Sequence, residues 1–194
     1  MKIRQLFVAC WFGVGVAAGV PAATPDTQGT KIEDSVTMSG VQLRLNGVGT
    51  RILGPNSLYV AGLYTNDKVT SLQDLIAAPG PKRLTMTFLR EIEAAPFGKL
   101  LTRGVENNVP KSELPQLVSG LIRMGEIFTA NKIMRPGESI WIDWVPGSGM
   151  IITAKGRVQG EPFKEPEFYR AMMSIWFGIA PADPRLKDAL LGAK

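Results

Sequence analysis

The sequence predicts an α+β fold in which helices cover one face of an antiparallel sheet. Alternating apolar and polar residues, separated by glycine- and proline-rich turns, occur in both the first and the last third of the chain. Apolar residues recur at helical spacing in the middle of the chain and again near its end. No linker, repeat or low-complexity stretch divides residues 36–194, so we expect a single domain.

The first half is predicted to contain a hairpin, a short helix and a strand. Val41, Leu43 and Leu45 alternate with polar residues, which is typical of a half-buried strand. Ser71 is a good helix cap with Asp74 three residues later, and the Pro-Gly-Pro run from residue 79 stops the helix. The predicted elements are strands over 41–53 and 58–65 joined by the four-residue turn 54–57, a helix over 72–78, and a strand over 82–92.

The second half is predicted to be helical first and then to return to strands. Helical spacing runs through residues 94–108, and again from a cap at Ser112 to Phe128. Pro166 favours a helix start and Gly178 a helix end. The remaining predicted elements are strands over 138–145, 150–154 and 157–160, and a short closing helix over 184–191.

The N-terminus has the pattern of a secretory signal peptide. Lys2 and Arg4 precede an uncharged apolar run, and small residues follow it near position 22. The run is shorter than the ~20 residues that span a bilayer. We expect residues 1–22 to be a signal peptide and 23–35 a flexible leader, with a secreted or periplasmic mature protein. If the segment is not cleaved, it supplies the protein's membrane contact.

Composition excludes several classes of site. The only cysteine, Cys10, lies in the predicted signal peptide, and the chain has no histidine. Disulfides, thiolate or histidine metal sites and histidine-dependent catalysis are therefore not expected in the mature protein. We expect no cofactor and no metal. The net charge of +5 falls by two, to +3, without Lys2 and Arg4, and the other basic residues are scattered. We therefore do not expect nucleic-acid binding.

The segment Gly47-Val48-Gly49 raises the question of a phosphate-binding loop. The third glycine of a dinucleotide fingerprint is replaced by Ile52, and the segment leads into a turn and strand instead of a helix. We interpret it as a strand with a bulge or a close backbone approach at the glycines. Arg51 is then either a surface arginine whose stem covers apolar neighbours, or an anchor for an anion.

Three further residues are candidates for a site, each with a structural alternative. Tyr59 and Tyr64 have opposite parity on one predicted strand, so only one of them can share a cleft with Arg51. Either phenol would donate a hydrogen bond, and either would equally serve as a half-buried strand aromatic. Asn108 ends a helical pattern and is also explained as a helix cap.

Several motifs, in order, resemble the chalcone isomerase-like family. They are LNGVGTR, YVAGLYT, KRLTMTFLREI with PF a few residues later, and a late helix closing with SIWFG. The resemblance runs from about Val36 to Leu191, and its layout is similar to that of secreted bacterial members. It implies an open-faced β-sandwich: a long antiparallel sheet, a layer of helices over it, and a ligand cleft between them.

The resemblance also implies roles for particular residues. In the family's enzymes, which close a chalcone to a flavanone, the arginine of the G-x-G-x-R motif assists the reaction, and it matches Arg51. The catalytic threonine matches Tyr59, the catalytic tyrosine falls near Leu101, its asparagine partner near Asn108, and the late serine or threonine near Tyr169. With several catalytic positions replaced, we expect binding rather than catalysis.

The hypothesis that follows is a non-catalytic periplasmic protein that binds a fatty acid or similar amphipathic carboxylate. The family's fatty-acid-binding branch resembles this chain in pairing an arginine with a tyrosine of the adjacent strand. Arg51, Tyr59 and Tyr64 are the candidate binding residues. The first alternative is an isomerase acting on a flavonoid-like enone with Arg51 and Asn108. The second is an interaction role in the envelope, which would require a large exposed apolar patch.

Overall fold

The computed structural model describes residues 27–192 of the chain, so the predicted signal peptide lies outside the described residues. The strands are β1 (Ser35–Met38), β2 (Val41–Leu53), β3 (Asn56–Thr65), β4 (Lys82–Phe88), β5 (Ile92–Glu93), β6 (Ile133–Met134), β7 (Ser139–Val145), β8 (Gly149–Ala154) and β9 (Arg157–Val158). The helices are α1 (Leu72–Ala77), α2 (Ala94–Asn108), α3 (Leu114–Asn131), α4 (Pro166–Phe177) and α5 (Pro184–Leu191).

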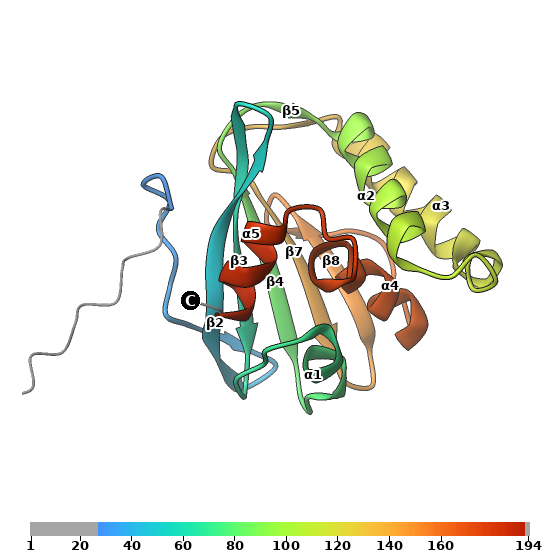
Figure 1. Cartoon of the computed structure of the whole chain (residues 1–194), viewed down its shortest axis with the longest axis horizontal. Coiled ribbons are helices and arrows are strands. Elements are labelled where there is room, and N and C mark those ends of the chain that lie inside the picture. Colours follow the sequence, from blue (N-terminus) through green and yellow to red (C-terminus); the bar gives the residue numbers. More distant parts are fainter. Residues whose placement is uncertain (1–26, 193–194) are drawn as a thin grey trace, which may run out of the picture.

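A seven-stranded antiparallel sheet forms the body of the molecule. Its strand order is β1-β2-β3-β4-β7-β8-β9, and β5 pairs with β6 in a separate two-stranded sheet. Figure 1 shows α5, α4 and α1 in front of one face of the sheet. Helices α2 and α3 lie side by side at the upper right of the view. We call this face the covered face. The predicted α+β class and the open-faced sandwich are confirmed.

The main core lies between the covered face and the helices. Along β4 the burial alternates, and Leu84, Met86 and Phe88 lie in this core. Helix α4 is buried along most of its length because it packs on the sheet on one side and on α2 and α3 on the other. Amphipathic helices layered on one sheet face are the expected way to bury both apolar surfaces.

Local sequence signals predicted most element bounds. The predicted helices 94–108 and 184–191 match α2 and α5, and Gly178 ends α4 as predicted. Ser71 caps α1 and accepts a hydrogen bond from the Asp74 N–H at 3.0 Å. Helix α3 begins two residues after its predicted cap, with Glu113 at the N-cap position.

Three predicted strand ends were wrong by two residues or more, and one of them is that of the strand predicted over 157–160, which ends at Val158. The hairpin loop has two residues, Gly54 and Pro55, because Leu53 pairs with Asn56. Gly54 has a φ of +57°, which is the conformation that the first position of such a tight turn requires. The strand predicted over 82–92 ends at Phe88, since the chain bends before Ile92 and Glu93 pair with β6.

Within residues 27–192, no helix covers the opposite face of the sheet, which carries a small apolar cluster at the β1 end. Met38, Leu43 and Tyr64 form this cluster, and Ile32 packs against it. The described part of the predicted leader thus contacts the sheet, with the Glu33 carbonyl accepting a hydrogen bond from the Tyr64 hydroxyl at 3.0 Å. Among residues 27–192, no helix combines the length and the apolar character that crossing a membrane requires.

Candidate functional site

A bulge at Asn46 decides which face of the sheet Arg51 occupies. Leu45 lies opposite Tyr64, but the next pair is Gly47 with Leu63, so Asn46 is an extra residue in β2. An extra residue reverses the in-and-out alternation of the strand beyond it. Leu45 therefore faces the open side with Tyr64, whereas Arg51, six residues later, faces the covered side opposite Tyr59.

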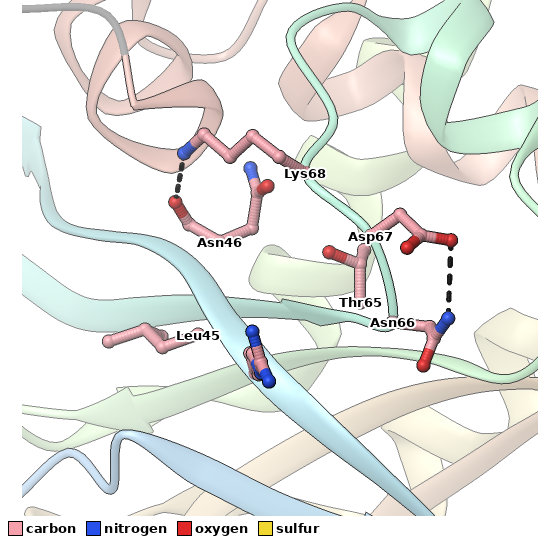
Figure 2. A pocket seen from close by; sticks show the side chains of 7 residues that line it. Leu45, Asn46, Thr65, Asn66, Asp67 and Lys68 are labelled. Atoms are coloured by element: carbon pink, nitrogen blue, oxygen red, sulfur yellow. Dashed lines mark hydrogen bonds between the residues drawn. The ribbon is translucent and has the colours of Figure 1, made fainter.

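The Asn46 bulge is held to the end of α5 by its own side chain. Its amide nitrogen donates to the carbonyls of Val69 at 3.0 Å and Leu190 at 2.8 Å, and its amide oxygen accepts from the Val69 N–H. Figure 2 shows Lys68 reaching the Asn46 carbonyl, a hydrogen bond of 2.6 Å, beside a cavity of about 250 Å³. These contacts anchor the C-terminal end of α5 on β2.

Gly47 and Gly49 allow α5 to lie directly on β2. A Cβ on Gly47 would stand 2.7 Å from the Leu190 carbonyl carbon, with the carbonyl oxygens of Ala189 and Leu190 nearer still. A Cβ on Gly49 would stand 2.8 Å from the Ala189 Cβ. The prediction of a bulge or a close backbone approach at these glycines is confirmed by the close approach of α5, and the bulge itself lies one residue earlier, at Asn46. The first turn of α5 consequently lies beside Arg51, two residues beyond Gly49 on the same face.

Arg51 is a partly buried cation that forms an ion pair with Asp183. Its side chain is 15% exposed, and Nη1 lies 3.4 Å from Oδ2 of Asp183. The same Nη1 donates to the Ile52 carbonyl at 3.0 Å. Within the described residues both contacts use Nη1, so Nε and Nη2 remain available as donors. Arg51 is thus not an exposed surface arginine.

Tyr59 lies directly opposite Arg51 on β3 and is fully buried. Its hydroxyl accepts a hydrogen bond from the Trp176 Nε1–H at 3.0 Å and retains its own proton as a donor. Burial raises the pKa of Tyr59 to about 12, against smaller lowering effects from the Trp176 hydrogen bond and the Arg51 charge. The phenol is therefore neutral at physiological pH and is kept as a hydrogen-bond donor.

The other two candidate residues lie elsewhere. Tyr64 faces the open side, as its opposite parity to Tyr59 predicts. Its hydroxyl donates a hydrogen bond to the Glu33 carbonyl. Asn108, in the last turn of α2, donates both amide hydrogens to the carbonyls of Gly104 and Ala180, each at 2.8 Å. Its oxygen accepts from the Ala180 N–H. Asn108 therefore fastens the connection between α4 and α5 to α2.

Aromatic rings fill the interior next to Tyr59. Phe88, Phe97 and Phe128 extend from it in a chain of edge-to-face contacts with centroids 5.4–6.0 Å apart. Leu101, where the family's catalytic tyrosine would fall, is buried in the same core. Tyr169 stacks on Trp144 at 4.8 Å, and burial raises its pKa. These positions serve packing in this chain.

An apolar groove lies between α1 and the C-terminal helices. It consists of two adjoining cavities of about 440 and 340 Å³ that share Leu72 and Gln73. We call it the α1 groove. Its other lining residues are Thr70, Ser71, Ile76, Ala77, Arg170, Phe177, Gly178, Ile179, Lys187 and Leu191. Ile179 is 92% exposed, and the size and apolar character of the groove are those of small-molecule sites.

Two residues near the candidate site were missed by sequence reasoning. Asp183 precedes Pro184, which is a recognisable signal for a helix start, but nothing local indicates that its carboxylate meets Arg51. Trp176 was assigned to an apolar helix face, and its hydrogen bond to Tyr59 spans 117 positions in the sequence. Among the described residues no group of three or more acidic or cysteine side chains is arranged to hold a metal ion.

Comparisons with known proteins agree with this architecture. The family model described as chalcone isomerase-like matches residues 23–192. No match was found among curated proteins. Among solved structures, a crystal structure of a fatty-acid binding protein from Arabidopsis thaliana is similar, with a TM-score of 0.64 and 17% sequence identity, covering 86% of this chain and 93% of that one. At that identity the likeness concerns the fold, and the family rests on the sequence match. The chain belongs to the chalcone isomerase-like family.

Proposed function

We propose that this protein binds a fatty acid or a similar amphipathic carboxylate and does not catalyse a reaction. We further propose that it acts outside the cytoplasm, in the periplasm or secreted, after removal of residues 1–22. The observation that carries the binding proposal is the pair formed by Arg51 and Tyr59. They lie opposite each other on neighbouring strands of the covered face, one cationic and one neutral, both largely shielded from water.

This pair has the chemistry that a carboxylate needs. A guanidinium stays charged when partly buried and donates two parallel hydrogen bonds to a carboxylate. Nε and Nη2 of Arg51 are the two donors that form such a fork, and Tyr59 supplies a third donor. Charge-assisted hydrogen bonds of this kind fix a head group, while apolar surface holds the tail. The fatty-acid binding protein with the same fold supports this class of ligand.

We assign the acyl tail to the α1 groove. Phe177 and Gly178 in its wall directly follow Trp176, the residue that contacts the Tyr59 hydroxyl. Helix α5 connects the two regions, with Asp183 at its start near Arg51 and Leu191 at its end in the groove wall. Eight helical residues span about 12 Å. An acyl chain held at Arg51 would have to extend about this far along α5 to enter the groove.

The isomerase alternative receives no support from Asn108. A catalytic amide has to present a free donor or acceptor to the substrate, whereas both amide hydrogens and the oxygen of Asn108 are bonded to backbone groups. The positions near Leu101 and Tyr169 are likewise occupied by buried packing residues. The residues present therefore favour binding without catalysis over the isomerase alternative.

The test compares Arg51→Ala with Arg83→Ala. Arg83 forms a bidentate pair with Asp143 at 2.7 and 2.6 Å and is 14% exposed, so the two variants lose similarly buried arginines. Arg83 belongs to the open face with Tyr64, its neighbour across the strands. Affinity for palmitic acid is measured by displacement of a fluorescent acyl probe, and native mass spectrometry identifies any ligand that copurifies.

We expect Arg51→Ala to weaken palmitate binding at least tenfold, because a hydrogen bond to a charged group contributes about 1.5–3 kcal/mol. Arg83→Ala should bind with wild-type affinity. Ala77→Trp, which places a bulky ring in the α1 groove, should weaken long-chain acids more than short-chain acids. Absence of binding by the wild-type protein, or equal losses in the two arginine variants, would refute the proposal.

A further inference from the structure

The connection between α4 and α5, residues 178–183, is hydrogen-bonded to residues of α2, α4 and α5. Asn108 holds Ala180 through two hydrogen bonds, and the Lys187 Nζ donates to the Gly178 carbonyl at 2.8 Å. The Ala182 N–H donates to the Ile175 carbonyl at 2.7 Å. The last residue of the connection, Asp183, is therefore held in one position beside the sheet.

Both carboxylate oxygens of Asp183 accept hydrogen bonds from backbone N–H groups, and one of them also lies beside Arg51. Oδ1 accepts from the backbone N–H groups of Arg185 and Leu186, which caps α5. Oδ2 accepts from the Ile52 N–H at 3.2 Å and lies 3.4 Å from Nη1 of Arg51. The Asp183 side chain is 6% exposed. The side chain of Arg185 is 3.9 Å away and 79% exposed, so water screens its charge.

We infer that Asp183 is a built-in competitor for the head-group site and determines how tightly the protein holds an anionic ligand. This inference rests on the proposed function. Arg51 already faces one carboxylate, so a ligand carboxylate must either displace Asp183 or lie beside it. Two like charges at close range in a partly buried site are unfavourable. In both cases the charge of Asp183 lowers the affinity for a carboxylate.

The same geometry distinguishes acids from neutral ligands. An alcohol with the same acyl chain carries no charge, so it neither gains the full attraction of Arg51 nor meets repulsion from Asp183. Removing the charge of Asp183 should therefore strengthen binding of the acid and leave binding of the alcohol unchanged. A residue with a purely structural role would change the affinity for both ligands by the same factor.

The decisive variant is Asp183→Asn, because asparagine keeps an oxygen that caps α5 and carries no charge. Its NH2 takes the place of the oxygen that accepts from the Ile52 N–H, and the alcohol measurement corrects for this structural change. Affinities for palmitic acid and cetyl alcohol are measured side by side in the wild-type protein, in Asp183→Asn and in the control Asp143→Asn. Asp143 pairs with Arg83, the arginine on the open face. Asp183→Ser, a second uncharged cap, covers the case in which the asparagine variant folds poorly.

We expect Asp183→Asn to bind palmitic acid about tenfold more tightly, with cetyl alcohol within twofold of wild type. Asp143→Asn should leave both affinities unchanged. If the wild-type protein binds palmitate through Arg51 but Asp183→Asn binds it no more tightly, or shifts acid and alcohol equally, the role of Asp183 is refuted and the proposed function stands. If the wild-type protein binds neither ligand, or Arg51→Ala binds palmitate as the wild type does, both are refuted together.

Discussion

Replacement of Gly47 by alanine tests the contact that positions α5, and with it Asp183, over the sheet. The glycine lies beside the Asn46 bulge and faces the carbonyl groups at the end of α5. The added Cβ would stand 2.7 Å from the Leu190 carbonyl carbon, and carbon atoms rarely approach a real Cβ closer than 3.4 Å. Since the neighbouring atoms are backbone, no side-chain rotation relieves the overlap. The helix and the strand must separate by about 1 Å.

The expected cost follows from what that separation disturbs. Overpacking of a well-packed contact costs about 1–3 kcal/mol. The hydrogen bond from Asn46 to the Leu190 carbonyl, now 2.8 Å, would be stretched beyond bonding range, and such a bond contributes about 0.5–1.5 kcal/mol. Leu190 and Leu186 would also lose part of their packing. We therefore expect the free energy of unfolding to fall by about 2–4 kcal/mol.

Chemical denaturation followed by tryptophan fluorescence and circular dichroism measures this change. Gly125→Ala is the control, because Gly125 lies within helix α3 with nothing within 4 Å of its added Cβ. Alanine is the better helix former, so this variant should gain up to about 1 kcal/mol. The two glycine-to-alanine changes thus have opposite predicted signs. A Gly47→Ala protein as stable as the wild type, or a Gly125→Ala protein equally damaged, would show that the reasoning is wrong.

Two further predictions concern ionisation and helix capping. The chain has three tyrosines, Tyr59, Tyr64 and Tyr169, and burial raises the pKa of each above its usual value. The unfolded chain therefore releases the phenol protons at lower pH than the native protein does. The free energy of unfolding should therefore keep its full value below about pH 10 and fall as the pH rises toward 12. Tyr59 should account for about 2–3 kcal/mol of this loss. Tyrosinate absorbance recorded against pH checks this, and native tyrosines that ionise near their ordinary pKa would contradict it. Ser71→Ala removes the cap of α1 and should cost about 1 kcal/mol, measured as faster amide hydrogen exchange in α1, and unchanged exchange would contradict the assigned cap.

Elements with local signals were predictable from the sequence, and those that depend on distant partners were not. The bounds of α2 and α5 follow from helical spacing and from the turn residues beside them. The short strands β5 and β6 carry too few residues to show a period, and they exist because Ile92 pairs with Met134 across two helices. The hairpin loop was predicted to be too long because Asn56 and Ser57 favour turns, yet both pair with β2.

The candidate site shows the same division. The sequence singled out Arg51 and Tyr59 through their residue types and the family resemblance, and the parity of the tyrosines placed them on opposite faces. It also led us to expect a bulge or a close approach at Gly47 and Gly49. Asp183 was recognisable only as part of a helix start, because its pairing with Arg51 spans more than a hundred positions.

The sequence by itself determined the α+β class, the bounds of α2, α4 and α5, and the residue types available for binding, because spacing, caps and composition act over a few neighbouring positions. Only the tertiary structure decided that Arg51 and Tyr59 lie on the same face. The reason lies in two irregularities of the ladder. The extra residue Asn46 reverses the alternation of β2 and donates to the Leu190 carbonyl at the end of α5, and the extra residue Leu58 in β3 places Tyr59 opposite Arg51. Without the Asn46 bulge Arg51 would face the open side with Tyr64, away from Asp183 and, within residues 27–192, away from the helices.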